Sequence, residues 1–206
     1  MFQFDTNGTP TTSVTNLYDY ALSRDTGHPP AVRADMNRAG RMAVVYFSET
    51  AKFQLPLYEE YILAQLLNSN GSPAAPAVLV NQRLVAYRPV VAVTPDGGAV
   101  VAWEDASVSA YSYDAGHDIY ARRIDANGNP IGSEFRVNTS INGRNGDAEI
   151  AISTNGSFAI VWTQSLSDAD GVYLQRFSAD GSRLGPEMRA SPYNGLDPQV
   201  AMSPDG

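Results

Sequence analysis

Acidic residues gather where one apolar run ends and a polar stretch begins. Glu104 and Asp105 close the run Ala99–Asp105, and Asp114 and Asp118 follow in the polar stretch. A glycoside-cleaving site needs two carboxylates about 5 to 10 Å apart that face one pocket, and this is the only dense acidic group in the chain. Acidic side chains on loops are usually only solvated, so the group by itself predicts no catalytic residue.

The sequence contains few residues that could act as a catalytic nucleophile or as its base. The chain has no cysteine, only two histidines, and no Gly-x-Ser-x-Gly turn of the kind that presents a catalytic serine. His28 and His117 each end a loop and precede a strand-like run, and we expect both to be solvated. The arginine cluster with an acid and a tyrosine that a sialidase would need is also missing.

One segment carries oxygen ligands at the spacing of a calcium loop. Asp125, Asn127 and Asn129 occupy its first, third and fifth positions, but Pro130 stands where such a loop needs glycine and Arg136 where it needs glutamate. Asn-Gly is also a favoured pair in tight hairpin turns. We therefore predict a hairpin turn, with no metal at Asp125 and no cofactor.

Turn signals recur along the whole chain with a common period. One series of Asn-Gly or Asp-Gly turns places its glycines 63, 57 and 53 residues apart, and a second series places them 57, 59 and 50 residues apart. Two interleaved series of this kind indicate an internal repeat. The first series contains Gly8, Gly71, Gly128 and Gly181, and the second contains Gly40, Gly97, Gly156 and Gly206.

Four short runs rich in Val, Ile, Tyr and Phe fill each repeat, as expected for β-strands. The stretch Leu57–Leu67 has helical character, but its second half aligns with third strands of other repeats, and we interpret that half as a strand. The first strands are Ala31–Asp35, Pro89–Val93, Ala148–Ile152 and Pro198–Met202; the second are Arg41–Glu49, Ala99–Asp105 and Ser157–Gln164; the third are Phe2–Asp5, Glu60–Asn68, Asp118–Asp125 and Gly171–Ser178; the fourth are Thr11–Asn16, Ala75–Asn81, Ser133–Thr139 and Pro186–Ser191.

Four antiparallel strands in 50 to 60 residues, repeated in tandem, predict an all-β fold of the β-propeller type, in which each repeat is one blade. The second strands are apolar on both faces, as blades covered by their neighbours require. Trp103 and Trp162 hold equivalent second-strand positions and are expected in the core. The chain is read as one repeat domain with a partial blade at 1–29, full blades at 30–88, 89–147 and 148–197, and the first strand of a further blade at 198–206.

The segments Pro95–Trp103 and Ile119–Thr139 also resemble a known class of repeat. They are similar to the tandem "Asp-Gly-Gly…Val-Val-Ala-Trp…Ile-Tyr-Ala-Arg-Arg-hydrophobic-Asp" repeats of large secreted or surface-bound bacterial proteins. The match is close in 89–147, good in the following repeat and faint earlier, where Gly40 lacks the Asp-Gly-Gly and Tyr46 replaces the tryptophan. The resemblance implies propeller-like modules in extracellular multidomain proteins, usually without an assigned activity.

The amino-acid composition argues against some classes of binding partner. The 206 residues carry a net charge of −8, with 17% charged and 43% apolar residues, and no cluster of Lys and Arg. An acidic chain of this kind is not expected to bind nucleic acid or anionic membranes. No apolar run is long enough to insert into a membrane, and the N-terminus shows no signal peptide. We therefore expect either a cytoplasmic chain or a piece of a longer exported protein, and the resemblance favours an extracellular or cell-surface location.

The long loops fall on one face of the predicted blades, and the tight glycine turns fall on the other. Tyrosines and acids on adaptable loops are suited to binding a protein or a glycan, although ordinary solvated loops have the same composition. The candidate ligand-binding residues on this long-loop face are Tyr111, Tyr113, Asp114, His117, Asp168, Asp170 and Tyr193.

Function at this level is a choice between three classes. The expected function is a non-catalytic structural or interaction module, not an enzyme, that works in adhesion or as a scaffold. The alternative is a lectin-like, carbohydrate-binding propeller, and a glycoside-active enzyme comes third. Because the count of strands leaves the ring of blades incomplete, we also expect a homo-oligomer, most simply a dimer, or a place in a longer repeat array.

Overall fold

The computed structural model describes residues 2–4, 10–13, 32–48, 61–83, 85–106, 116–140, 143–165, 170–191 and 197–206; for 2–4, 10–13 and 47–48 it describes the backbone only. Every regular element in these ranges is a β-strand, so none of them contains a helix that could span a membrane. The strands are β1 (Phe2–Phe4), β2 (Pro10–Ser13), β3 (Arg33–Met36), β4 (Met42–Ser48), β5 (Tyr61–Leu67), β6 (Val78–Leu79), β7 (Ala86–Val93), β8 (Ala99–Asp105), β9 (Asp118–Ile124), β10 (Pro130–Arg136), β11 (Arg144–Ile152), β12 (Phe158–Ser165), β13 (Gly171–Phe177) and β14 (Met188–Ser191).

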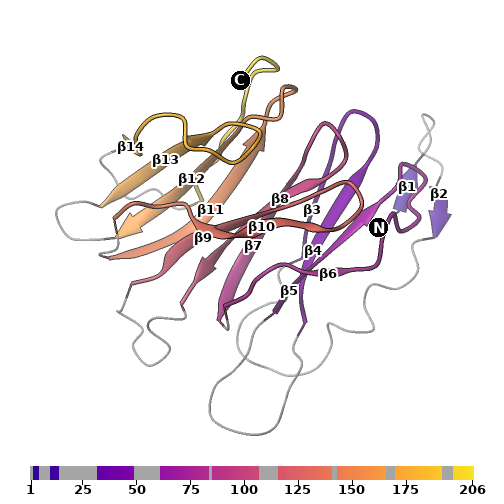
Figure 1. Cartoon of the computed structure of the whole chain (residues 1–206), viewed down its shortest axis with the longest axis horizontal. Coiled ribbons are helices and arrows are strands. Elements are labelled where there is room, and N and C mark those ends of the chain that lie inside the picture. Colours follow the sequence, from indigo (N-terminus) through magenta and orange to yellow (C-terminus); the bar gives the residue numbers. More distant parts are fainter. Residues whose placement is uncertain are drawn as a thin grey trace, which may run out of the picture.

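Consecutive strands form three separate four-stranded antiparallel sheets, which lie side by side in Figure 1. The first sheet is β3 to β6, the second β7 to β10 and the third β11 to β14, and in each the strands pair in chain order. A short β1–β2 pair stands apart from them. The sheets match the predicted repeats, and the helix-like stretch before Leu67 ends in the strand β5, as its alignment with the other repeats predicted.

Tight turns join first to second strands and third to fourth strands. At Asp125 the backbone N–H donates to Asn129 O at 2.8 Å, and the carboxylate accepts the N–H groups of Asn127 and Asn129. The predicted hairpin turn is thus confirmed. Gly98 allows a close approach in the adjacent turn, since a Cβ there would lie 2.3 Å from the carbonyl oxygen of Ile124.

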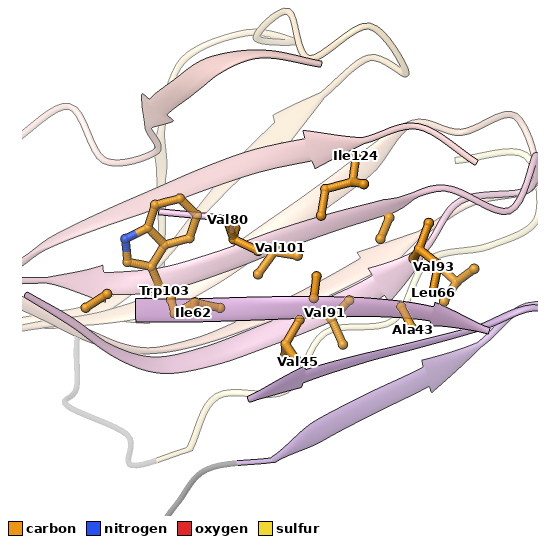
Figure 2. Packing of buried hydrophobic residues seen from close by; sticks show 13 residues of the cluster. Ala43, Val45, Ile62, Leu66, Val80, Val91, Val93, Val101, Trp103 and Ile124 are labelled. Atoms are coloured by element: carbon orange, nitrogen blue, oxygen red, sulfur yellow. The ribbon is translucent and has the colours of Figure 1, made fainter. Parts of the chain in front are cut away.

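The sheets pack face to face, and two apolar clusters fill the spaces between them. The cluster between the first and second sheets contains Ile62 and Val45 on one side and Val101 and Trp103 on the other (Figure 2). The cluster between the second and third sheets is centred on Trp162. Both tryptophans are fully buried, as predicted, and every residue of β8 is buried because this strand is covered on both faces.

The first strands of the three sheets, β3, β7 and β11, are neighbours, as the inner strands of successive propeller blades should be. The side chain of Asp35 in β3 accepts the N–H of Val93 in β7 at 2.7 Å, which ties the first two inner strands together. The architecture is therefore an all-β propeller-type repeat of four-stranded antiparallel blades. We refer to β3–β6, β7–β10 and β11–β14 as blades 1, 2 and 3.

One predicted strand does not form. The segment Pro198–Met202, expected to be the first strand of a further blade, has no strand conformation. The turn that follows it contacts blade 3, where Pro204 O accepts the N–H of Thr154 at 3.0 Å. The strand pattern in the sequence is present, but no strand in the described part of the chain pairs with it.

Candidate functional site

The inner strands surround a groove of about 640 Å³. It is bounded by β3 of blade 1, β7 of blade 2, β11 of blade 3 and the segment Met202–Pro204. The first strands of all three blades therefore line it, together with the segment that follows blade 3. Because the first strand of each blade lies nearest the propeller axis, this groove occupies the place of a central channel. Its charged lining residues are Arg33, Asp35, Arg38 and Glu149.

The carboxyl of Glu149, which lines the groove, has a shifted pKa. Burial raises the pKa of its carboxyl above the usual 4.5, the charge of Asp197 raises it further, and the guanidinium of Arg33 opposes the shift. Glu149 comes from β11, Arg33 from β3, and Asp197 from the segment after blade 3. Two charges, one from blade 1 and one from the segment after blade 3, therefore act on this carboxyl, and a partly buried carboxyl with a raised pKa is suited to general acid chemistry.

Three residues that directly precede the first strands expected from the sequence share an uncommon backbone conformation. Arg88, Asp147 and Asp197 have φ angles of 46°, 50° and 55°, a region that side chains other than glycine seldom adopt. Arg88 and Asp147 lie within β-bulges, where the pairing of the inner strand with the second strand shifts register. The conformation recurs at equivalent positions of successive repeats, and backbone strain of this kind is concentrated at functional sites.

Below two of these residues lies a buried carboxylate, Glu104, at the boundary of blades 2 and 3. Only 1% of its side chain is exposed. It accepts the backbone N–H of Asp147 at 2.8 Å, and it faces Arg88 at 3.4 Å, His117 at 3.5 Å and Arg144 at 3.8 Å. We call these five residues the Glu104 cluster.

The cluster is bound together from both blades. Arg88 of blade 2 forms an ion pair with Asp147 of blade 3, and the hydroxyl of Thr163 donates to Gly146 O at 3.0 Å beside it. Gly146 is needed for space, since a Cβ there would lie 3.0 Å from an oxygen of Glu104. Burial raises the pKa of Glu104, but the contacts with His117, the Asp147 N–H and the two arginines outweigh burial, and the net shift is downward.

The structure corrects two expectations about these residues. Glu104 and Asp105, predicted to belong to a solvated acidic group, end a buried strand and are each 1% exposed. His117, also predicted to be solvated, is 13% exposed, because its ring stacks on Tyr87 and faces Glu104. Asp105 is directed to a different partner, Arg83, at 3.3 Å. The neighbouring blade 3 provides partners for Glu104, whereas His117 is covered by Tyr87 and Glu104 of its own blade, and the local sequence reveals neither arrangement.

Of the candidate residues on the long-loop face, the structure describes two. His117 belongs to the Glu104 cluster, and the backbone carbonyl of Asp170 accepts a hydrogen bond from Arg189. The prediction that Tyr111 and Tyr113 are exposed beside Asp168 and Asp170 lies outside the described residues. The others that lie outside them are Asp114 and Tyr193.

Sequence reasoning missed Arg33, Arg88, Asp147, Glu149 and Asp197. For Arg88, Asp147 and Asp197 a signal was available, because each directly precedes a predicted first strand, namely Pro89–Val93, Ala148–Ile152 and Pro198–Met202. Within the described ranges no group of three or more His, Asp or Glu residues has metal-binding geometry. At Asp125 one carboxylate oxygen is engaged by N–H donors of its own turn.

Comparisons with known proteins return solved structures only. No protein-family model matches the chain, and no curated protein sequence is significantly similar to it. One similar solved structure is an endo-arabinase from Bacteroides thetaiotaomicron, with a TM-score of 0.47 and 9% identity over 85% of this chain. Another is a xylan beta-1,4-xylosidase from Bacillus halodurans, with a TM-score of 0.42 and 13% identity over 76% of this chain.

The chain spans 65% of the length of the arabinase and 29% of that of the xylosidase. Both structural neighbours are enzymes by name, a finding that contradicts the prediction of a non-catalytic module and the prediction that the chain is not an enzyme. Both predictions are therefore withdrawn. They relied on the absence of a recognisable catalytic motif, and side chains contributed by different blades form no motif along the sequence.

Proposed function

We propose that the chain is a glycoside-active propeller whose proton-donating carboxyl, that of Glu149, lines the inner-strand groove. The observation that carries the proposal is Glu149, a partly buried carboxyl that lines an open groove and whose pKa is raised by burial, with a smaller contribution from the charge of Asp197. Glycoside cleavage needs such a pair, in which one carboxyl holds a proton and the other is ionised.

In this proposal each residue has a role that follows from its surroundings. Glu149 donates a proton to the oxygen that leaves the sugar, because burial favours its protonated form. Asp197, which is exposed and whose charge acts on Glu149, supplies the second carboxyl group in this proposal. Arg33, across the groove, limits the shift of Glu149 and would contact hydroxyl groups of a bound sugar.

The test is hydrolysis of a panel of glycosides by the purified chain. Chromogenic arabinosides and xylosides belong in the panel together with hexosides and neutral polysaccharides. We expect turnover of at least one member, and we expect Glu149→Gln and Asp197→Asn each to reduce kcat by roughly 10²-fold or more, the range for loss of an acid or base. The matched control is Glu187→Gln, because Glu187 accepts the N–H of Thr139 away from the groove.

Binding of sugars without turnover by the wild-type chain would contradict the proposal. So would equal activity of the wild type and both groove variants, since it would place the reaction elsewhere. An extracellular location and self-association of the chain remain further proposals. The acidic composition without basic clusters supports the choice of neutral polymers over nucleic acid as the partner.

A further inference from the structure

The Glu104 cluster departs from the repeat on which the fold is built. At the boundary of blades 2 and 3, Arg144, Asn145 and Gly146 lead into β11, whereas the equivalent residues that lead into β7 are Val85, Ala86 and Tyr87. Both sets serve the same structural purpose of joining one blade to the next. The polar set is therefore not required by the propeller fold itself.

Burying this carboxylate is costly unless partners compensate. Removing a carboxylate from water costs several kcal/mol in proteins, and attraction to neighbouring charges recovers that energy only with good geometry. Glu104 has such partners from three elements: Arg88 in β7, Arg144 and Asp147 in β11, and His117 just before β9. Apolar residues such as Val85 and Ala86, which stand at the equivalent positions at the start of blade 2, would join the blades without the cost of burying a charge.

Two partners of Glu104, Arg88 and Asp147, reach the surface of the protein. The side chain of Arg88 is 53% exposed and that of Asp147 is 23% exposed, while Glu104 beneath them is 1% exposed. Arg88 and Asp147 both adopt the left-handed backbone conformation, and the Asp147 N–H donates a hydrogen bond to the Glu104 carboxylate. Asp147 also stands two residues from Glu149, and two residues of chain span at most about 7 Å.

We propose that Glu104 is a positioning residue: its buried carboxylate fixes Arg88 and the Asp147 backbone, and because Asp147 stands two residues before Glu149, it sets the position of Glu149 in the groove. The inference rests on the proposed function for its effect on turnover, but the positioning itself is a property of the fold. Glu104 does not touch substrate in this account. It acts through the Asp147 N–H and the Arg88 guanidinium.

The experiment compares wild type, Glu104→Gln and a control, Asp105→Asn. Gln keeps the shape and an acceptor oxygen but removes the charge, and Asp105 is equally buried but pairs with Arg83. Two measurements are made on each protein: kcat and KM on the best glycoside of the panel, and hydrogen exchange of peptides that cover 85–93 and 143–152. Exchange needs no substrate, so it reports on positioning even if the chain turns over no glycoside.

We expect Glu104→Gln to speed exchange in both peptides and to lower kcat by roughly 10²-fold with a smaller change in KM, the penalty for misplacing reacting groups by about 1 Å. Asp105→Asn should leave both peptides and kcat at wild-type values. Unchanged exchange in Glu104→Gln would overturn the inference, as would faster exchange with unchanged kcat in an active protein. If the wild type lacks turnover, the proposed function fails, and exchange alone decides the positioning role.

Discussion

The indole Nε1 of Trp162 donates a hydrogen bond to the side-chain oxygen of Asn145 at 3.1 Å, in the core between blades 2 and 3. Trp103 holds the equivalent position in blade 2, but its Nε1 is buried without a hydrogen-bond partner. The reason lies in the sequence, because Ala86 stands where blade 3 has Asn145. The indole N–H of Trp162 thus has a hydrogen-bond acceptor, and the indole N–H of Trp103 at the equivalent position has none among the described residues.

This difference predicts the effect of Asn145→Ala. The substitution removes the acceptor of the Trp162 N–H and also the hydrogen bond from Asn145 Nδ2 to His117 O at 2.9 Å. A buried donor left without a partner costs about 1–3 kcal/mol. We expect a loss of that size in the free energy of unfolding, measured in urea. A loss below about 0.5 kcal/mol, the usual net contribution of a weak hydrogen bond, would show that the Trp162 donor finds another acceptor.

Gly98 provides a test of the tight turns. In Gly98→Ala the new methyl group would lie 2.3 Å from the carbonyl oxygen of Ile124, and backbone must move to admit it. We expect a cost of about 3 kcal/mol or more, the upper end for overpacking. Gly185→Ala is the control, since no atom lies within 4 Å of its added Cβ and only the left-handed conformation, at roughly 1–2 kcal/mol, opposes it. Equal costs for the two variants would refute the packing argument.

The turn at Asp125 should behave as a hairpin turn and not as a calcium site. Its carboxylate accepts N–H groups from Asn127 and Asn129, and these bonds lower its pKa. Asp125→Ala is expected to lower Tm by the same amount in calcium and in a chelator. A rise in Tm on adding calcium to the wild type, abolished in Asp125→Ala, would prove the turn to be a metal site.

Glu149 should cost stability at neutral pH. A carboxyl whose pKa is raised by folding stabilises the native state below its unfolded pKa, and that contribution disappears as the pH rises through the folded value. Glu149→Gln, which cannot ionise, should therefore have a higher Tm than wild type at pH 7 and an equal Tm near pH 3. Thermal unfolding followed by circular dichroism at both pH values measures the difference. A lower Tm of the variant at pH 7 would mean that the ionised form is stabilised, as by Arg33.

Much of the fold could be predicted from the sequence, because hairpin turns and strand alternation are local signals. The Asn127-Gly128 turn and the apolar second strand at Trp103 were both predicted, and the sheets follow them. The site could not be predicted in this way. Glu104 ends a predicted strand and His117 has the sequence context of a loop residue, but the partners that surround them, Asp147 and Arg144 of blade 3 for Glu104 and Tyr87 for His117, are distant in the sequence.

The groove residues were missed for a related reason. Arg33 and Glu149 line the groove from different repeats, 116 residues apart in the chain, and Asp197, whose charge acts on Glu149, lies 48 residues beyond Glu149. Their effect on one another depends on the curvature that brings inner strands around a common axis. A pattern search along the chain treats each as an isolated surface charge.

The most direct test of the central claim is the pH dependence of glycoside hydrolysis by the wild type and by Glu149→Gln. If Glu149 is the proton donor, wild-type kcat falls as the pH rises through a pKa above 4.5, since the donor must hold its proton. The variant should then be slower by roughly 10²-fold or more and lack that alkaline limb. A variant with wild-type kcat and an unaltered pH profile would contradict the account.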